Sequence, residues 1–364
     1  MAKPGRRGRG AVTIEDVARA AGVSAMTVSR VINQGRNVRD STRAAVLEAI
    51  EKLNYSPNTA ARSLAAGEAA HIGLLYANPS AGYLAQFLIG ALHAARSGGV
   101  HLVIESCESE DADEQAEVIR RFANSDVEGV ILPPPLSESQ PILVELEAMQ
   151  IPAVTVAVGT PREAGLNVRI DDYAAAMEMT RYLLDLGHRE IGFIKGHPNI
   201  IASHDRFRGF CDALREAGID ADAMAVEQGY FSYRSGLTAG ERLLSKPNPP
   251  TAIFASNDDM AAATVSVAHR RGYNVPDDLS IVGFDDTALA TSVWPELTTV
   301  KQPIAAMAEA AVELLIADLR RRRTGAPHKF AERVLTHAMI IRESSAAPPG
   351  AKKAKPRKAV AKSP

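Results

Sequence analysis

Between residues 12 and 57 apolar side chains recur every three or four positions, which predicts three short amphipathic helices. Thr13 is expected to cap the first helix, and Gly22 to end it, because glycine adopts a left-handed backbone most easily. Ser24 caps the second helix and Pro57 stops the third. A helix, a tight glycine turn and a second helix are typical of a helix-turn-helix unit. The expected buried residues are Ile14, Val17, Ala18, Ala21, Val28, Val31, Ile32, Ala45, Val46, Ala49, Ile50 and Leu53.

The next segment, "NTAARSLAAG" at 58–67, is rich in alanine and prone to form a helix. It spans only about ten residues, and a helix of that length is marginal alone in water because nucleation is costly. We therefore expect it to be ordered only when another surface holds it.

From His71 onward the pattern changes, because short apolar runs alternate with longer amphipathic ones. This alternation favours parallel sheets covered by helices on both faces. Nine strand candidates over roughly 270 residues exceed one small sheet, so two lobes are expected. Ligands in such sheets bind at the carboxyl ends of the strands, and a cleft between two lobes would collect those ends. The strand candidates are "HIGLLYA", "VHLVIES", "EGVILP", "PAVTVAV", "EIGFIKG", "AMAVEQGY", "TAIFASN", "SIVGFD" and "LTTVKQ".

The net charge of −2 hides an uneven distribution. Residues 1–67 carry +6, residues 346–364 carry +6, and the segment between them carries −14. A compact basic unit joined to an acidic body suggests that the basic unit meets a polyanion. The last segment is rich in Ala, Pro and Lys without apolar periodicity, so it is expected to be disordered.

Several protein classes are disfavoured by composition. No apolar run is long enough for a membrane span, and the basic N-terminus is not followed by the apolar region of a secretory signal. Cys107 and Cys211 lie far apart in no metal or redox spacing, so we interpret them as buried thiols in a reducing compartment. The expected location is the cytoplasm, in association with the nucleoid.

The order of these parts resembles the lac repressor family of bacterial transcription regulators over about residues 12–342. The motifs that carry the resemblance are "TIEDVARAAGVSAMTVSRVIN", "LNYSPNTAARSLAAG", "DLGHREIGFIKG", "SHDRFRGFCDALREAG", "TAIFASNDDMAAATVSVAHRRGYNVPDDLSIVGFDD" and "PELTTVKQP". Six motifs in the same order are far more specific than any one alone.

The resemblance implies an all-α helix-turn-helix headpiece followed by an α/β core of two doubly wound parallel-sheet lobes, similar to periplasmic binding proteins. The expected domains are a basic disordered tail at 1–11, a DNA-binding headpiece at 12–57, a hinge helix at 58–67, a ligand-binding and dimerisation core at 68–342, and a basic disordered tail at 343–364. The first lobe is expected at about 71–170 and 302–330, and the second at about 171–301 and 331–342.

The resemblance also implies which residues contact DNA. Arg30 on the second helix would donate to a guanine edge in the major groove, while Ala25 and Met26 would select bases by packing. In the hinge, Leu64 and Ala65 would enter the minor groove. Further expected contacts to DNA come from Thr13, Ser24, Thr27, Ser29, Asn33 and Asn58.

Polar residues that follow core strands form the expected ligand site. Carboxylates, amides and a guanidinium around one cleft suit a polyhydroxylated ligand, because each hydroxyl both donates and accepts. The aromatic rings of Tyr83 and Phe231 are candidates to pack against the face of a sugar or a base. The resemblance implies Arg206, Asn257 and Asp285 as the central ligand residues. The full set of expected ligand-binding residues is Asn78, Tyr83, Asp171, Arg206, Phe231, Asn257 and Asp285.

We therefore predict a ligand-responsive transcription regulator, a repressor of carbohydrate-use genes, which acts as a homodimer on operator DNA. A purine- or nucleoside-responsive regulator is the main alternative, and a solute-binding protein is a weaker one. Paired carboxylates at Asp258, Asp259 and Asp286 would fit a glycosidase, but no catalytic or metal-binding motif accompanies them. We expect no enzyme activity, no cofactor and no metal, and the sequence leaves open whether the effector releases or tightens DNA binding.

Overall fold

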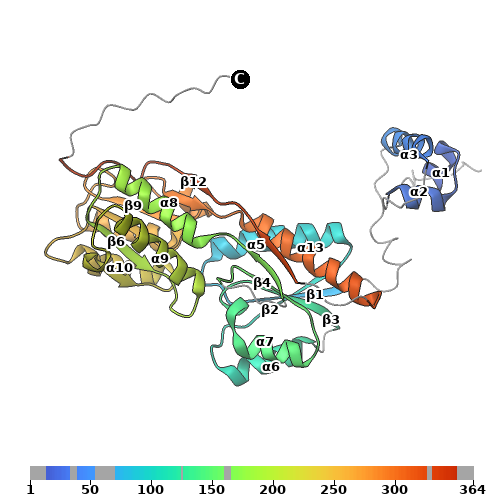
Figure 1. Ribbon diagram of the computed structural model, residues 1–364, viewed down its shortest axis with the longest axis horizontal. Helices are drawn as coiled ribbons and strands as arrows, with labels where there is room; N and C mark the ends of the chain where they lie inside the picture. Colours follow the sequence, from blue (N-terminus) through green and yellow to red (C-terminus); the bar gives the residue numbers. More distant parts are fainter. Residues whose placement is uncertain are drawn as a thin grey trace, which may run out of the picture. The chain divides into compact units, whose positions relative to one another are not determined.

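The computed structural model describes residues 14–32, 39–53, 70–123, 126–159, 165–325 and 330–350. The chain divides into two compact units, 1–69 and 70–364, which are described separately (Figure 1). No helix in the described ranges has the length and apolar character that a bilayer span requires.

The first unit contains three helices, α1 (Ile14–Ala21), α2 (Ala25–Ile32) and α3 (Asp40–Lys52). Gly22 has φ +65°, as a left-handed turn after α1 requires. The Thr27 amide donates to Ser24 Oγ at 3.2 Å, so Ser24 caps α2 as predicted. The small core of this unit is formed by Val17, Ala18, Val28, Val31, Val46 and Ala49.

The second unit contains two six-stranded sheets, one in each lobe. The sheet of the first lobe has the strand order β11-β5-β4-β3-β1-β2, and every pair in it is parallel. Its elements are β1 (His71–Tyr76), α5 (Ala81–Gly98), β2 (His101–Ser106), α6 (Ala112–Ala123), β3 (Val127–Leu132), η1 (Leu136–Glu138), α7 (Gln140–Ala148), β4 (Ala153–Val156), β5 (Leu166–Arg169), α13 (Ile304–Arg323) and β11 (Ala331–Val334).

The sheet of the second lobe has the order β12-β10-β9-β8-β6-β7, parallel except where β12 runs antiparallel to β10. Its elements are α8 (Asp172–Asp185), β6 (Ile191–Lys195), α9 (Ile201–Glu216), η2 (Ala221–Ala223), β7 (Val226–Gln228), α10 (Tyr233–Leu244), β8 (Ala252–Ala255), α11 (Asp258–Arg270), β9 (Ser280–Asp285), α12 (Ala288–Ser292), β10 (Thr298–Lys301) and β12 (Ala338–Ile340).

Helices cover both faces of the sheets, with α8 packed on α9 and α10 on α11 in the second lobe (Figure 1). Covered parallel strands lie between two apolar layers, which explains why β8 and β9 are buried along their whole length. The predicted fold class is therefore confirmed.

The predicted lobe boundaries need one correction. The segment 331–342 was assigned to the second lobe, but Ala331–Val334 forms β11 and pairs in parallel with β5 in the first. Strands β5 and β11 were missed because they are short and carry polar residues, so neither shows a continuous apolar run. Strand β12 was missed because it has only three residues.

The predicted disordered tail also begins too early. Ser344 is fully buried, and its carbonyl accepts from the Ile281 amide at 2.9 Å. The Ala346 carbonyl lies 2.9 Å from His188 Nε2 and accepts from Ser280 Oγ at 3.0 Å. Residues 343–346 are thus attached to the second lobe by backbone hydrogen bonds, which an apolar pattern does not reveal. Residues 351–364 lie outside the described part of the chain.

His188 anchors this C-terminal segment and generates a testable prediction. Its ring is buried, and Nδ1 lies 2.9 Å from Thr251 Oγ1. Burial lowers the pKa of His188, so the unfolded chain takes up a proton more readily than the folded one. The folding stability that this neutral imidazole contributes is therefore lost as pH falls below about 6.5.

We expect His188→Gln to destabilise the protein by about 1–3 kcal/mol at pH 7.5. The difference from wild type should shrink at pH 5.5, because only the wild type is penalised by histidine protonation. Urea unfolding of both proteins at the two pH values tests this, and a difference that grew on acidification would contradict it.

Candidate functional site

In the first unit, helix α2 exposes a chemically mixed surface. Met26 is 66% exposed, and the exposed Arg30 places Nη2 3.7 Å from Met26 Sδ. Ser24 Oγ and Thr27 Oγ1 lie 2.9 Å apart at the start of the helix. The surface therefore offers a guanidinium, a thioether and hydroxyls, while Val28 and Val31 on the same helix are buried. The expected DNA contacts Thr13, Asn33, Asn58, Leu64, Ala65 and the Ser29 side chain lie outside the described residues.

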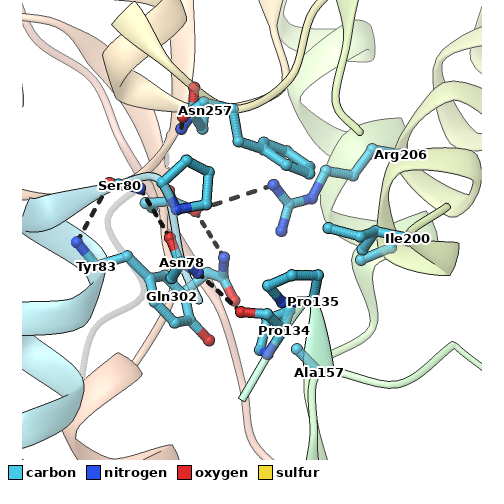
Figure 2. Close-up of a pocket in the computed structure, with 14 residues that line it drawn as sticks. Asn78, Ser80, Tyr83, Pro134, Pro135, Ala157, Ile200, Arg206, Asn257 and Gln302 are labelled. Carbon is cyan, nitrogen blue, oxygen red and sulfur yellow. Dashed lines mark hydrogen bonds and ion pairs between the residues drawn. The ribbon is translucent and has the colours of Figure 1, made fainter. Parts of the chain in front are cut away.

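In the second unit, a cavity lies between the two lobes, at the carboxyl ends of their strands (Figure 2). Figure 2 shows Asn78, Tyr83 and Gln302 on one side of it and Ile200 and Arg206 on the other. Six of the seven predicted ligand-binding residues line the cavity: Asn78, Tyr83, Arg206, Phe231, Asn257 and Asp285.

Arg206 is the central charge of this cavity. It is 4% exposed, its Nε donates to Asp172 Oδ1 at 2.8 Å, and its Nη1 donates to the Ser256 carbonyl. The guanidinium lies 3.6 Å from the centroid of the Phe284 ring. Each of these contacts restricts the plane of the guanidinium, so Arg206 is held in one orientation.

The one predicted ligand residue that does not line the cavity is Asp171, whereas its neighbour Asp172, also outside the lining, contacts Arg206. Asp171 is exposed and accepts from the Ala174 amide at 2.9 Å, so it caps α8. Asp172 is buried in the first turn of α8 and binds Arg206. Burial raises the pKa of Asp172, although the guanidinium opposes this.

Two of the predicted residues use their polar atoms to hold the cavity wall. Asn78 donates to the Pro134 carbonyl at 3.2 Å and accepts from the Ser80 amide at 2.9 Å. Asn257 caps α11 by accepting from the Met260 amide at 3.0 Å, and it donates to the Phe231 carbonyl at 2.9 Å. Both amides therefore stabilise the cavity wall through hydrogen bonds to backbone groups.

The unpaired buried side-chain atoms of the described cavity lining belong to Tyr83 and Gln302. Tyr83 Oη and Gln302 Oε1 are buried and have no hydrogen-bond partner among the described residues. Gln302 Nε2 donates to Asp285 Oδ1 at 2.7 Å, which leaves the amide oxygen as the free acceptor. Burial raises the pKa values of Tyr83 and Asp285 well above their usual ranges. Sequence reasoning missed Gln302, although "KQP" follows a strand as the other site residues do.

The backbone around the cavity is strained. Ala157, Phe231 and Asp285 line it with φ angles of 57°, 57° and 114°, a region that L-residues rarely adopt. Such conformations persist only where the surrounding structure enforces them, and they are concentrated at functional sites.

The neighbouring carboxylates have structural partners. Asp258 accepts from the Thr287 amide at 2.8 Å and Thr299 Oγ1 at 2.7 Å, and burial raises its pKa to about 7. Asp259 accepts from Ser80 Oγ at 2.6 Å, which links the two lobes. Asp286 pairs with Arg342 at 2.6 Å. Asn257 caps α11, whereas these three carboxylates join separate elements.

The free space enclosed by these residues is about 40 Å³. That volume holds about three or four water molecules, since one needs about 10–15 Å³. The lobes therefore surround the site closely, and any larger molecule must also occupy the space beside it.

Comparisons with known proteins agree with this geometry. Residues 13–58 match the family described as bacterial regulatory proteins, lacI family, and residues 180–345 match the periplasmic binding protein-like domain. Catabolite control protein A of Priestia megaterium is 35% identical over 305 residues, which cover 84% of this chain and 91% of the relative.

Two solved structures extend the comparison to the fold. A complex of the transcriptional regulator CelR with cellobiose has a TM-score of 0.69 at 31% identity, covering 92% of this chain and 100% of the other. A lac repressor dimer bound to operator and the anti-inducer ONPF has a TM-score of 0.68 at 27% identity, covering 93% and 100%. The chain therefore belongs to the lacI family of bacterial regulatory proteins, which are DNA-binding transcriptional regulators and not enzymes.

Proposed function

We propose that this protein is a transcriptional repressor of carbohydrate-use genes. It binds operator DNA as a homodimer through α2, and a sugar-type effector between the core lobes changes its affinity for the operator. It works in the cytoplasm, in association with the nucleoid.

The observation that carries the effector proposal is the pair of unpaired buried atoms, Tyr83 Oη and Gln302 Oε1. Leaving a buried polar atom without a partner costs about 1–3 kcal/mol, so a ligand that bonds both recovers that cost. Tyr83 offers a donor and Gln302 an acceptor, and a sugar hydroxyl can satisfy either. The cellobiose bound to the CelR structure makes a carbohydrate the first candidate. The proposed ligand set is Asn78, Tyr83, Arg206, Phe231, Asn257, Asp285 and Gln302.

The DNA proposal rests on the exposed face of α2. Arg30 is free to point into the major groove and Met26 offers an apolar contact of the kind that packs on a thymine methyl group. Ser24 and Thr27 would contact phosphates. The remaining proposed contacts are Thr13, Ala25, Ser29, Asn33, Asn58, Leu64 and Ala65.

Exposed apolar side chains support the homodimer. Ile89 and Leu92 on α5 are 66% and 51% exposed, and Trp294 after α12 is 75% exposed. Large apolar residues that remain in contact with water are the kind that a second copy of the chain covers.

Replacing Arg30 tests the DNA contact. We expect Arg30→Ala to weaken binding to an operator selected from random DNA by about 10–100-fold and to relax base preference at one position, because a bidentate guanine contact is lost. Fluorescence anisotropy with the selected duplex measures this. Arg19→Ala is the matched control, since Arg19 is an exposed cation on α1. Equal losses in the two variants would mean that Arg30 contributes only charge.

Replacing Tyr83 separates effector binding from folding. Tyr83→Phe removes an oxygen that has no partner, so thermal stability should stay equal or rise, while the response of operator binding to the effector weakens about 5–20-fold. The readout is operator affinity in a titration with effectors found by a thermal-shift screen of sugars, purines and nucleosides.

The matched control is Tyr182→Phe, because Tyr182 Oη lies 2.9 Å from Ser345 Oγ and outside the cavity. We expect it to lower stability and to leave the effector response intact. Stabilisation by a purine alone in the same screen would contradict the carbohydrate proposal and favour the purine-responsive alternative.

A further inference from the structure

A second, larger chamber lies beside the small cavity around Arg206, which is the inner chamber of the two. This outer chamber has a volume of about 550 Å³. The two chambers are adjacent, because four residues line both of them: Pro79, Pro135, Ile200 and Phe231. Small-molecule binding sites have volumes of about 300–1,000 Å³, and the outer chamber falls in this range whereas the inner chamber is too small by itself. A small-molecule ligand that bonds Tyr83 and Gln302 would therefore extend towards the outer chamber.

The outer chamber is lined by acidic side chains. Glu108, Glu110 and Glu138 line it, and His197 faces Glu110 with 3.4 Å between Nε2 and Oε1. Arg206 is the one Lys or Arg among the described residues that line either chamber. Asp172 and Asp285 already lie beside that guanidinium, at 2.8 and 3.9 Å. No free cation in the described lining is therefore available to balance an anionic ligand.

The unpaired atoms of the inner chamber also favour an uncharged ligand. Gln302 Oε1 needs a donor, which an ionised phosphate or carboxylate does not have. An anion placed there would also face the Asp285 side chain that Gln302 holds. A neutral hydroxyl satisfies Gln302 by donating to it, and a second hydroxyl can accept from Tyr83.

We propose that the two chambers together select an uncharged oligosaccharide of more than one ring, and that Glu108 and Glu110 exclude phosphorylated and uronic acid sugars. This inference rests on the proposed function, because it specifies the effector of the same cleft. Neutral sugars bind without an electrostatic penalty, whereas an added negative charge is repelled by the two exposed carboxylates, an effect that salt screens.

Matched ligands test the selection with the full-length protein. The probes are cellobiose, maltose, lactose and melibiose, each compared with its 6-phosphate and its uronic acid derivative, and with the constituent monosaccharides. Thermal shift identifies the members that bind, and calorimetry measures their affinities. We expect binding by at least one neutral disaccharide, and binding at least about tenfold weaker for its anionic derivatives and its monosaccharides.

Charge-neutral variants identify the source of the selection. In Glu108→Gln/Glu110→Gln the ratio of neutral to phosphorylated affinities should fall about tenfold. Both side chains are exposed, so the variant should keep the fold, which its melting temperature checks. Glu114→Gln is the matched control, because Glu114 is an exposed acid on α6 that does not line either chamber. Raising NaCl from about 0.05 to 0.5 M should also lower the ratio of neutral to phosphorylated affinities in the wild type, because salt screens exposed charges.

Three outcomes would overturn the inference. If a sugar phosphate or a uronic acid binds as tightly as its neutral parent, the charge selection is wrong while the carbohydrate effector stands. If the double variant has the same affinity ratio as wild type and Glu114→Gln, Glu108 and Glu110 do not discriminate between neutral and phosphorylated sugars. If no sugar of either charge binds, the carbohydrate effector itself fails and the selection with it.

Discussion

The cleft depends on the burial of one guanidinium. Removing a charged group from water costs several kcal/mol unless partners compensate, so Arg206 can be buried only where Asp172, the Ser256 carbonyl and the Phe284 ring meet it. These partners come from the start of α8, the end of β8 and the end of β9, while Arg206 itself lies on α9. The charge therefore ties together four elements of the second lobe, and the wall of the cleft takes its shape from that requirement.

The groups of the cleft divide into those that maintain it and those left for a ligand. Asn78, Asn257 and Asp258 form hydrogen bonds that hold loops and strands in place. Tyr83 Oη, on α5, and Gln302 Oε1, in the segment between β10 and α13, are left without partners among the described residues, on the side of the cavity opposite Arg206 (Figure 2). A ligand bound in the cavity would thus connect the wall around Arg206 to two polar atoms that have no hydrogen-bond partner in the described part of the protein. By bonding both sides, the ligand can favour one arrangement of the lobes.

Much of this organisation follows from sequence patterns, and the failures have physical causes. Strand ends pointed to Asn257 and Asp285 because parallel strands bring their carboxyl ends to one edge, while Arg206, which lies within α9, was placed in the site by the resemblance to the lac repressor family. Asp171 and Asp172 both follow β5, so their position after a strand does not distinguish them. The rotation of helix α8 turns Asp172, and not Asp171, towards Arg206. The attachment of Ser344 and Ala346 uses backbone carbonyls, which every residue has, so no residue type signals it. Strand β11 is a polar edge strand, and such strands lack the apolar run that identified the central ones.

The chain passes between the lobes three times, from β5 to α8, from β10 to α13 and from β11 to β12, with only two or three residues in each passage. A residue spans at most about 3.6 Å, so the lobes cannot slide apart or twist far without overstretching one of these segments. The three short segments therefore limit the relative motion of the lobes. Gln302 lies in one of these connections and also lines the cavity. A ligand that bonds Gln302 would thus act directly on a connection between the lobes, and not only on their facing walls.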